Sequence, residues 1–279
     1  MNNLIIISLI FRSRPVVRVD GNVKLEASNG QIDPENKTCT LKSGTSVSCL
    51  TIQGCLKYEG DAVPEDLQFM VTFKLDTKKA VSRLFFLNEE GSNEQTETLH
   101  LEKSKKLCKR SYIYLLPNVR DKLSSLEVQM TYTISPESND IYKTDSEELV
   151  PIIDPRQNLR ALTDAASILK DCGLDNVCIP DLKIETKLSM DKYLIGSEDT
   201  LELKIDITNE GEDAYEAALY VYLPQHVSYR KTEMIGSNPS EMVSVLCSPP
   251  TMDNNFVLKC DLGNPLMRFS QVPYFRLLN

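Results

Sequence analysis

Several residue types and motifs that mark common functional classes are scarce or missing in this chain. It has no tryptophan, two histidines and 11 glycines among 279 residues. It has no P-loop, no G-x-S-x-G, no H-E-x-x-H and no glycine-rich phosphate cradle. The carboxylate pairs Glu89-Glu90 and Glu147-Glu148 are adjacent in sequence, so on a strand their side chains point to opposite faces and make poor acid/base partners. These absences argue against an enzyme.

A basic surface and a membrane span are also missing. The net charge is -9, whereas a nucleic-acid binder needs a surface that neutralises phosphates. The basic cluster within residues 103–110 has acidic neighbours and is interpreted as a solvated loop or strand edge. No apolar run approaches the roughly 18–20 residues that a spanning helix requires.

The first residues, MNNLIIISLIF, contain a short apolar core. They lack the basic start and the A-x-A-like exit of a signal peptide. An extended, β-branched segment, FRSRPVVRV, follows at once. The pattern therefore favours a strand over a signal peptide.

Most of the chain has a hydrophobic period of two, which is typical of half-buried strands. LQFMVTFKLD places Phe69, Val71, Phe73 and Leu75 on one face, and LEVQMTYTI, which begins at Leu126, has the same pattern. DLKIETKLSM, TLELKIDITNEG, AALYVYLP and NFVLKCDLG repeat it in the second half. Short alternating strands between polar turns predict antiparallel β-sandwiches.

One stretch, NLRALTDAASILKDCG at residues 158–173, interrupts this pattern. It lacks the alternation and contains helix formers. We expect a connector between two sandwiches there, with a turn or two of helix.

Eight cysteines are present, an even number that allows a complete disulfide set with 105 possible connectivities. Neither the C-x2-4-C pairs of zinc sites nor a thioredoxin-type C-x-x-C occurs. Asn36-Lys37-Thr38 is a glycosylation sequon, which fits an oxidising, extracellular compartment. For the segment DCGLDNVC, residues 171–178, a disulfide staple and a cation-holding loop both remain open.

Seven segments together carry a family resemblance, in order and in register from about residue 11 to about 268. They are Arg12-Ser-Arg-Pro-Val-Val17, Asn36-Lys-Thr-Cys39 with Val47-Ser-Cys49, Cys55-Leu-Lys57, Arg120-Asp-Lys-Leu123, Asp171-Cys-Gly-Leu-Asp-Asn-Val-Cys178, Gly211-Glu-Asp-Ala-Tyr-Glu-Ala217 and Cys260-Asp-Leu-Gly-Asn-Pro265. The chain resembles the leg region of integrin α subunits, of the αV/α5/α8/αIIb-like class without an I domain.

The resemblance implies an all-β fold of two consecutive immunoglobulin-like antiparallel β-sandwiches, the second incomplete, joined by a short knee linker. The implied organisation is a residual strand or non-native start at 1–11, a thigh-like sandwich at 12–153, a linker with the genu disulfide loop at 154–178 and a truncated calf-1-like sandwich at 179–279. It also implies sequential disulfides, which pair Cys39–Cys49, Cys55–Cys108, Cys172–Cys178 and Cys247–Cys260.

A calcium ion at the knee is a further implication of the resemblance. Asp175 and Glu212 would supply carboxylates, and Cys172 and Val177 would supply backbone carbonyls, a donor set that suits a hard cation. The alternative is that Asp175 only caps a turn and no ion binds. The resemblance favours the ion.

The functional expectation is a non-catalytic strut and hinge of a cell-adhesion receptor, in the extracellular part of a plasma-membrane integrin complex. Its partner would be an integrin β subunit. Matrix ligand and membrane would be reached only through a propeller and a transmembrane helix that the chain lacks, as expected for a fragment. The alternatives are an unrelated secreted β-sandwich binding module, which the lack of tryptophan disfavours, and a secreted hydrolase, for which no converging acid/base pair is found.

Overall fold

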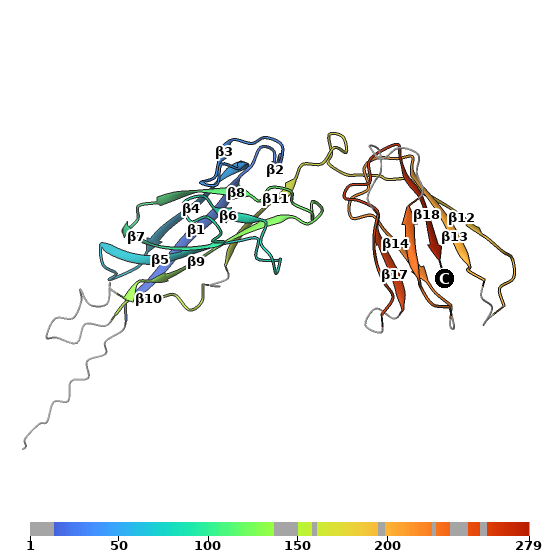
Figure 1. Ribbon diagram of the computed structural model, residues 1–279. Coiled ribbons are helices and arrows are strands. Elements are labelled where there is room, and N and C mark those ends of the chain that lie inside the picture. Colours follow the sequence, from blue (N-terminus) through green and yellow to red (C-terminus); the bar gives the residue numbers. More distant parts are fainter. Residues whose placement is uncertain are drawn as a thin grey trace, which may run out of the picture. The chain divides into compact units, whose positions relative to one another are not determined.

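The computed structural model consists of two compact units (Figure 1). It describes residues 14–136, 150–157, 161–194, 199–224, 227–234, 245–251 and 256–278. The predicted N-terminal strand at 1–11 lies outside these residues. All regular elements in the described ranges are strands, which confirms the all-β class.

The first unit is built from two sheets, one ordered β10-β1-β4-β8-β6, with β3 beside β4, and one ordered β2-β11-β9-β5-β7. The strands of the first sheet are β1 (Val16–Glu26), β3 (Cys39–Thr40), β4 (Ser46–Glu59), β6 (Leu84–Phe86), β8 (Leu107–Leu115) and β10 (Ile152–Ile153). Those of the second are β2 (Gln31–Ile32), β5 (Asp66–Leu75), β7 (Glu94–Glu102), β9 (Leu126–Ile134) and β11 (Leu162–Ile168).

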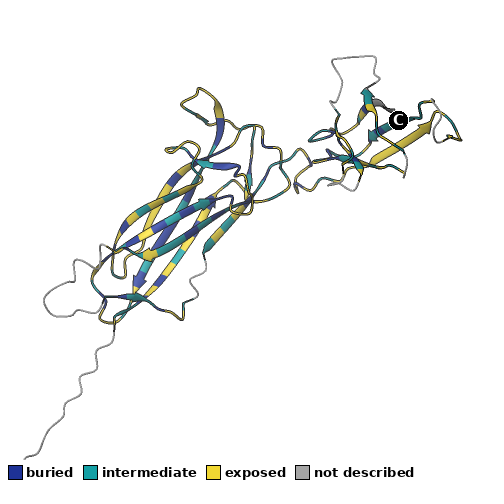
Figure 2. Cartoon of the chain, turned by 60° about the horizontal axis from the view of Figure 1, so that its bottom comes forward, coloured by how far each residue is buried: buried dark blue, intermediate teal, exposed yellow. Residues whose placement is uncertain are grey.

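The alternation in β5 places its apolar side chains in the core, as the sequence predicts. Phe69, Val71, Phe73 and Leu75 are each at most 1% exposed. Successive side chains of a strand point to opposite faces, so the intervening polar residues lie on the outer face. Buried and exposed residues accordingly alternate along the strands of this unit (Figure 2).

The expectation of a connector with helical turns at 158–173 is wrong for most of that segment. Residues 162–168 form β11, which pairs antiparallel with β9 so that Leu162 lies opposite Met130. Ala166 and Ile168 are buried, at 4% and 0% exposure. Strand pairing and burial override the weak helix preference of alanine and leucine, because propensity is worth only tenths of a kcal/mol per residue.

The second unit contains a four-stranded sheet, β12-β13-β18-β15, and a three-stranded sheet, β14-β17-β16. Their bounds are β12 (Leu182–Leu188), β13 (Glu202–Asn209), β14 (Ala218–Tyr222), β15 (Lys231–Met234), β16 (Leu246–Ser248), β17 (Val257–Asp261) and β18 (Ser270–Leu278). Its core includes Ile205, Ile207, Leu258, Cys260 and Val272.

Strand β12 forms where the alternation predicts, but it buries neither face. Leu182, Ile184 and Leu188 are 46%, 54% and 51% exposed. Ile184 lies opposite Ile207 of β13, so the apolar side of β12 is on the core face of its sheet. β12 is the edge strand, and the described part of the opposing sheet does not cover it.

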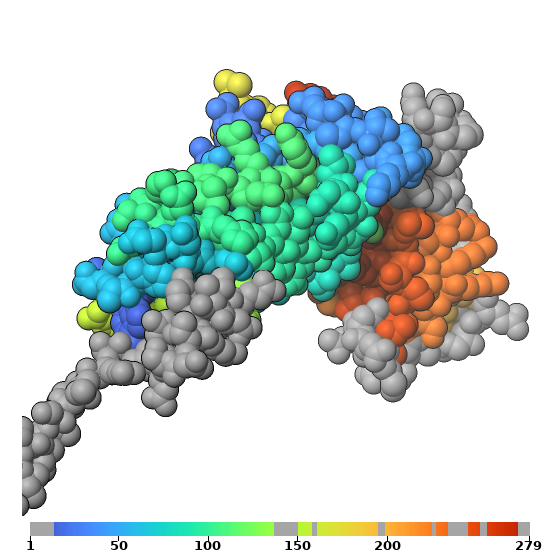
Figure 3. Space-filling model, turned by 90° about the vertical axis from the view of Figure 1, so that its left-hand side faces the viewer, coloured from blue at the N-terminus to red at the C-terminus, as the bar shows by residue number. Residues whose placement is uncertain are grey.

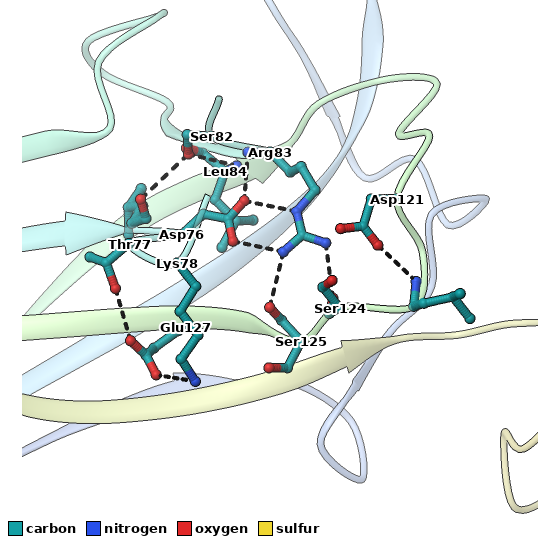
Figure 4. Close-up of polar contacts among 12 residues, drawn as sticks. Asp76, Thr77, Lys78, Ser82, Arg83, Leu84, Asp121, Ser124, Ser125 and Glu127 are labelled. Carbon is teal, nitrogen blue, oxygen red and sulfur yellow. Dashed lines mark hydrogen bonds and ion pairs between the residues drawn. The ribbon is translucent and has the colours of Figure 1, made fainter. Parts of the chain in front are cut away.

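A buried ion pair joins Asp76, just after β5, to Arg83, just before β6 (Figure 4). Asp76 Oδ2 accepts hydrogen bonds from Arg83 Nε at 2.8 Å and from the Arg83 backbone N–H at 2.9 Å, while Oδ1 accepts one from Nη2 at 2.7 Å. The guanidinium also donates to the carbonyls of Ser124 and Ser125, each at 2.9 Å. The pair thereby fixes the loop after β5 to the segment that enters β9.

Glu127 of β9 extends the same network towards the surface. It accepts hydrogen bonds from Thr77 at 2.8 Å and from Lys78 at 2.7 Å. The hydrogen bond from Lys78 lowers the pKa of the Glu127 carboxyl from its ordinary value.

In Figure 3 the cyan, teal and green segments, which include β5 and β7, lie together on the surface of this unit.

Candidate functional site in the Cys172–Cys178 loop

The loop between Cys172 and Cys178 is closed by a disulfide with a Cα–Cα distance of 4.9 Å. Gly173 and Asn176 have φ angles of +77° and +58°, in the left-handed region. Glycine reaches this region without a steric penalty, and asparagine tolerates it better than most residues. These two residues allow the chain to reverse within a short closed loop.

The buried side chain of Asn176 also stabilises the loop. Its side chain is buried, at 7% exposure, and its Oδ1 accepts a hydrogen bond of 2.7 Å from the Lys170 backbone N–H. No motif in the sequence predicts this role for Asn176. The available signal was that asparagine in turns commonly bonds to nearby backbone.

The two predicted carboxylate ligands are both anchored to the residues around Cys178. Asp175 Oδ1 accepts a hydrogen bond of 3.1 Å from the Val177 backbone N–H. Glu212 Oε2 accepts one of 2.9 Å from the Ile179 backbone N–H, and the Glu212 N–H donates to the Ile179 carbonyl at 3.1 Å. The structure thus brings Glu212 to the end of the loop, and Asp175 makes the turn contact given above as the alternative to ion binding.

The turn that presents Glu212 is held by Asn209, which is 1% exposed. Its Oδ1 accepts from the N–H groups of Gly211 and Asp181 at 3.1 and 3.2 Å, and its Nδ2 donates to the Glu212 carbonyl at 2.6 Å. A Cβ atom added to Gly211 would lie 2.4 Å from the Asp181 nitrogen. Only glycine therefore permits this close approach of the two backbone segments.

The donor chemistry of the four predicted ligand residues fits a hard cation. Asp175 and Glu212 each use one carboxylate oxygen for a backbone contact, and the other oxygen accepts no hydrogen bond within the described part of the chain. Cys172 and Val177 can contribute only main-chain carbonyls, because the Cys172 sulfur is in the disulfide. Among the described residues no group of three or more His, Cys, Asp or Glu side chains forms a metal cluster. A cation here would depend on main-chain oxygens and water as well.

The structure contains the four disulfides that the resemblance implies, and all eight cysteines take part in them. Cys55 and Cys108 lie opposite each other on β4 and β8, and Cys247 and Cys260 do so on β16 and β17. Asn36 of the sequon is exposed between β2 and β3, and its glycosylation stays a prediction.

The fold and the stapled loop define a protein of consecutive disulfide-bonded β-sandwich domains. Comparison with family models gives these domains a name: Integrin alpha Ig-like domain 1 matches residues 13–171, and Integrin alpha Ig-like domain 2 matches residues 172–278. The chain therefore belongs to the integrin alpha family, and the resemblance found in the sequence is confirmed.

Individual relatives agree with this family over nearly the whole chain. Integrin alpha-PS2 of Drosophila melanogaster is 37% identical over 96% of the chain, and integrin alpha-5 of Xenopus laevis is 33% identical over 93%. Integrin alpha-V of Gallus gallus is 33% identical over 93%. The matched region makes up 19%, 24% and 25% of these relatives, so the chain spans a quarter or less of their length.

Within the described ranges, no helix combines the length and the hydropathy that crossing a membrane requires.

Proposed function

We propose that this chain is a non-catalytic leg segment of an integrin α adhesion receptor, in which its two sandwiches act as struts and residues 169–171 act as a hinge. The family membership of both units supports this role. Leu169–Asp171 is the short stretch between the last residue of β11 and the stapled loop. Hinges are typically a few residues at the ends of elements that absorb large dihedral changes.

The observation that carries the hinge proposal is the attachment of the stapled loop to the second unit. Ile179 is bound to Glu212 through both its N–H and its carbonyl, and Glu210 N–H donates to the Asp181 carbonyl at 2.9 Å. The disulfide and these bonds make the loop a rigid extension of that unit. Bending would then involve the few residues before Cys172, with the hydrogen bond from the Lys170 N–H to Asn176 opening as they rotate.

The remaining activities of the receptor would lie outside this chain. We propose that the parent protein pairs with an integrin β subunit, is exposed on the outside of the plasma membrane and binds matrix ligand through a propeller domain. The sandwiches in this chain would transmit the bending and extension of that receptor.

The hinge proposal is tested by the distribution of distances between the two units. Dyes attached at the exposed positions Thr98 and Lys187 report this distance by single-molecule energy transfer. Replacing Cys172 and Cys178 by serine should broaden the distribution, because the pivot is no longer limited to residues 169–171. Replacing Cys39 and Cys49, which close a similarly short loop of separation 10, should not. An unchanged distribution in the first variant would contradict the hinge.

We further propose that the stapled loop binds one calcium ion. Asp175 and Glu212 would offer their second carboxylate oxygens, and Cys172 and Val177 their carbonyls. When bound, the ion supplies an electrostatic link between the loop and the turn at residues 209–213. Backbone hydrogen bonds already hold both carboxylates close to the segment 177–179, so little additional ordering is needed.

Calorimetric titration of Ca²⁺ into the chain tests the ion separately from the hinge. We expect one saturable site in the wild type and none in Asp175→Asn/Glu212→Gln, which loses both charges but keeps side-chain size. Glu210→Gln is the matched control, because that carboxylate is paired with Lys183 and lies outside the proposed ligand set. At a hundred times its Kd, Ca²⁺ should stabilise the wild type by about 2.7 kcal/mol. Identical titrations of wild type and double variant would refute the site.

A further inference from the structure

A groove opens between the two sheets of the first unit, at the side where β7 is the edge of one sheet and where the first half of β8 extends past the short edge strand β6 of the other. Its volume is about 300 Å³. The lining residues come from the segment just after β6, from β7 and from β8; they are Leu87, Asn88, Gln95, Glu97, Lys109, Arg110, Ser111 and Tyr112.

Polar side chains occupy the inward face of β7 along this groove. Leu99 and Leu101 are buried, at 8% and 1% exposure, and mark the core face of the strand. Gln95 and Glu97 have the same parity, so they point the same way. The interior of a sandwich is normally apolar, so this corner differs in chemistry from the rest of the core.

Strand β8 contributes matching polar groups from the opposite sheet. Ile113 and Leu115 mark its core face, at 0% and 2% exposure, and Lys109 and Ser111 share their parity. Lys109 Nζ lies 2.9 Å from Glu97 Oε2, an ion pair that joins the two walls of the groove. Each wall of the groove therefore contributes polar side chains to it.

One lining group lacks a partner. The Oε1 atom of Gln95 is buried and accepts no hydrogen bond from the described residues. Leaving a buried acceptor unsatisfied is unfavourable, because the atom has lost its hydrogen bonds to water. A ligand that brings an N–H or O–H donor into the groove would recover that free energy.

The edge of β8 beside the groove is open. β6 pairs with β8 only from Leu84 to Phe86, and the Leu87 N–H then donates to the Tyr112 carbonyl at 3.0 Å. The N–H and C=O groups of alternate residues point to the same side of a strand. Those of Cys108 and Arg110 therefore face the open side, where the described residues provide no pairing strand.

The charged side chains around this edge indicate which class of ligand it binds. Residues 103–110 carry five cationic and no anionic side chains, in a chain of net charge -9. Arg110, whose side chain is 63% exposed, lies on the outward face of β8 and is 3.5 Å from Glu26. Lys105 and Lys109 are also paired with carboxylates of the same unit. This internal neutralisation disfavours a highly sulfated polysaccharide, whereas an open edge with a groove suits a peptide.

We propose that the open edge of β8 and the adjoining groove bind an extended peptide segment of a partner protein, which adds to the sheet as a strand in continuation of β6. Main-chain hydrogen bonds to Cys108 and Arg110 would supply the affinity. Side chains of the guest opposite Lys109 and Ser111 would enter the groove, where a carboxamide can donate to Gln95. The guest side chain opposite Arg110 would point outward and carry a carboxylate, because opposite charges across a strand pair are favourable and the exposed guanidinium retains N–H donors beyond its contact with Glu26.

The test uses a fluorescein-labelled heptapeptide, VTQEQTV, whose two glutamines would face the groove and whose glutamate would face Arg110. Its binding to the chain is measured by fluorescence anisotropy, and amide hydrogen exchange should show protection at Cys108 and Arg110. The peptide VTLELTV, without carboxamides, and the peptide VTQKQTV, with reversed charge, should each bind about tenfold more weakly. Equal binding of all three peptides, or none by VTQEQTV, would overturn the proposal.

Variants of the chain separate edge pairing from simple charge attraction. Arg110→Pro removes both the charge and the outward N–H but leaves the β4 ladder intact, whereas Arg110→Gln removes only the charge. We expect the proline variant to bind VTQEQTV about tenfold more weakly than the glutamine variant. Gln95→Leu should erase the preference for VTQEQTV over VTLELTV, and Thr98→Ala, on the outer face of β7, should not.

Two outcomes in these variants contradict strand addition. Equal affinities of Arg110→Pro and Arg110→Gln would show that charge alone binds the peptide. Full displacement of the peptide by heparin, with all three peptides equivalent, would assign the edge to a polyanion.

Discussion

Replacing Arg83 by methionine is expected to lower the free energy of unfolding of the first unit by about 3–5 kcal/mol. The Asp76 side chain is fully buried, and the Arg83 side chain is only 8% exposed. Removal of the guanidinium leaves a buried carboxylate without its counter-charge. It also leaves the carbonyls of Ser124 and Ser125 without these donors.

This loss is measured by urea unfolding in which hydrogen exchange of the β5 and β9 amides is the readout. These amides belong to the first unit, so the signal reports on that unit alone. The double variant Asp76→Leu/Arg83→Met should recover much of the stability, since an apolar replacement of both partners removes the unpaired charge. Lys74→Met is the control, because the Lys74–Glu94 pair is exposed, at 44% and 52%, and should contribute less than about 1 kcal/mol. An Arg83→Met variant as stable as Lys74→Met would show that the pair is not structural.

Removal of the Cys55–Cys108 disulfide is expected to destabilise the first unit by about 4 kcal/mol. The bond closes a loop of sequence separation 53. In the chain-entropy account, a longer closed loop restricts the unfolded chain more strongly. In the folded unit the two cysteines lie opposite each other within the β4–β8 ladder, so their replacement by alanine should leave the native pairing in place.

The matched comparison is Cys39→Ala/Cys49→Ala, which opens a loop of separation 10. The same account gives about 2.7 kcal/mol for that loop, or roughly 1.5 kcal/mol less. Chemical unfolding of both double variants under identical conditions measures the difference. A larger loss from the shorter loop would mean that native contacts, and not the unfolded chain, determine the effect.

Strand identity was largely predictable, because it depends on local periodicity. Phe69, Val71, Phe73 and Leu75 share a face in any extended chain, and the structure buries all four. β11 was not predicted, because its local sequence lacks the alternation that indicates a strand. Its alanines and leucine favour no strand locally, and only the pairing of Leu162 with Met130, which lies far away in the sequence, makes the segment extended.

The candidate site was predictable as a loop but not as a set of contacts. The family resemblance named Cys172, Cys178 and Glu212, and the structure joins the two cysteines in a disulfide and places Glu212 on Ile179. Asn209 and Asn176, which hold the two segments in place, carried no comparable signal. Their partners are backbone groups on neighbouring turns, and those become neighbours only after the chain folds.

The sequence by itself determined the all-β class, the family and the positions of most strands, because alternation and motif order are properties of the linear chain. The tertiary structure alone decided which apolar faces are covered. β12 has the same alternation as β5, yet Ile184 is 54% exposed and Phe73 is 1% exposed. It also decided that Asp76 meets Arg83 in the core and that Glu212 reaches Ile179. Burial and hydrogen-bond partners depend on which segments lie opposite each other in space, and periodicity along the chain carries no information on that.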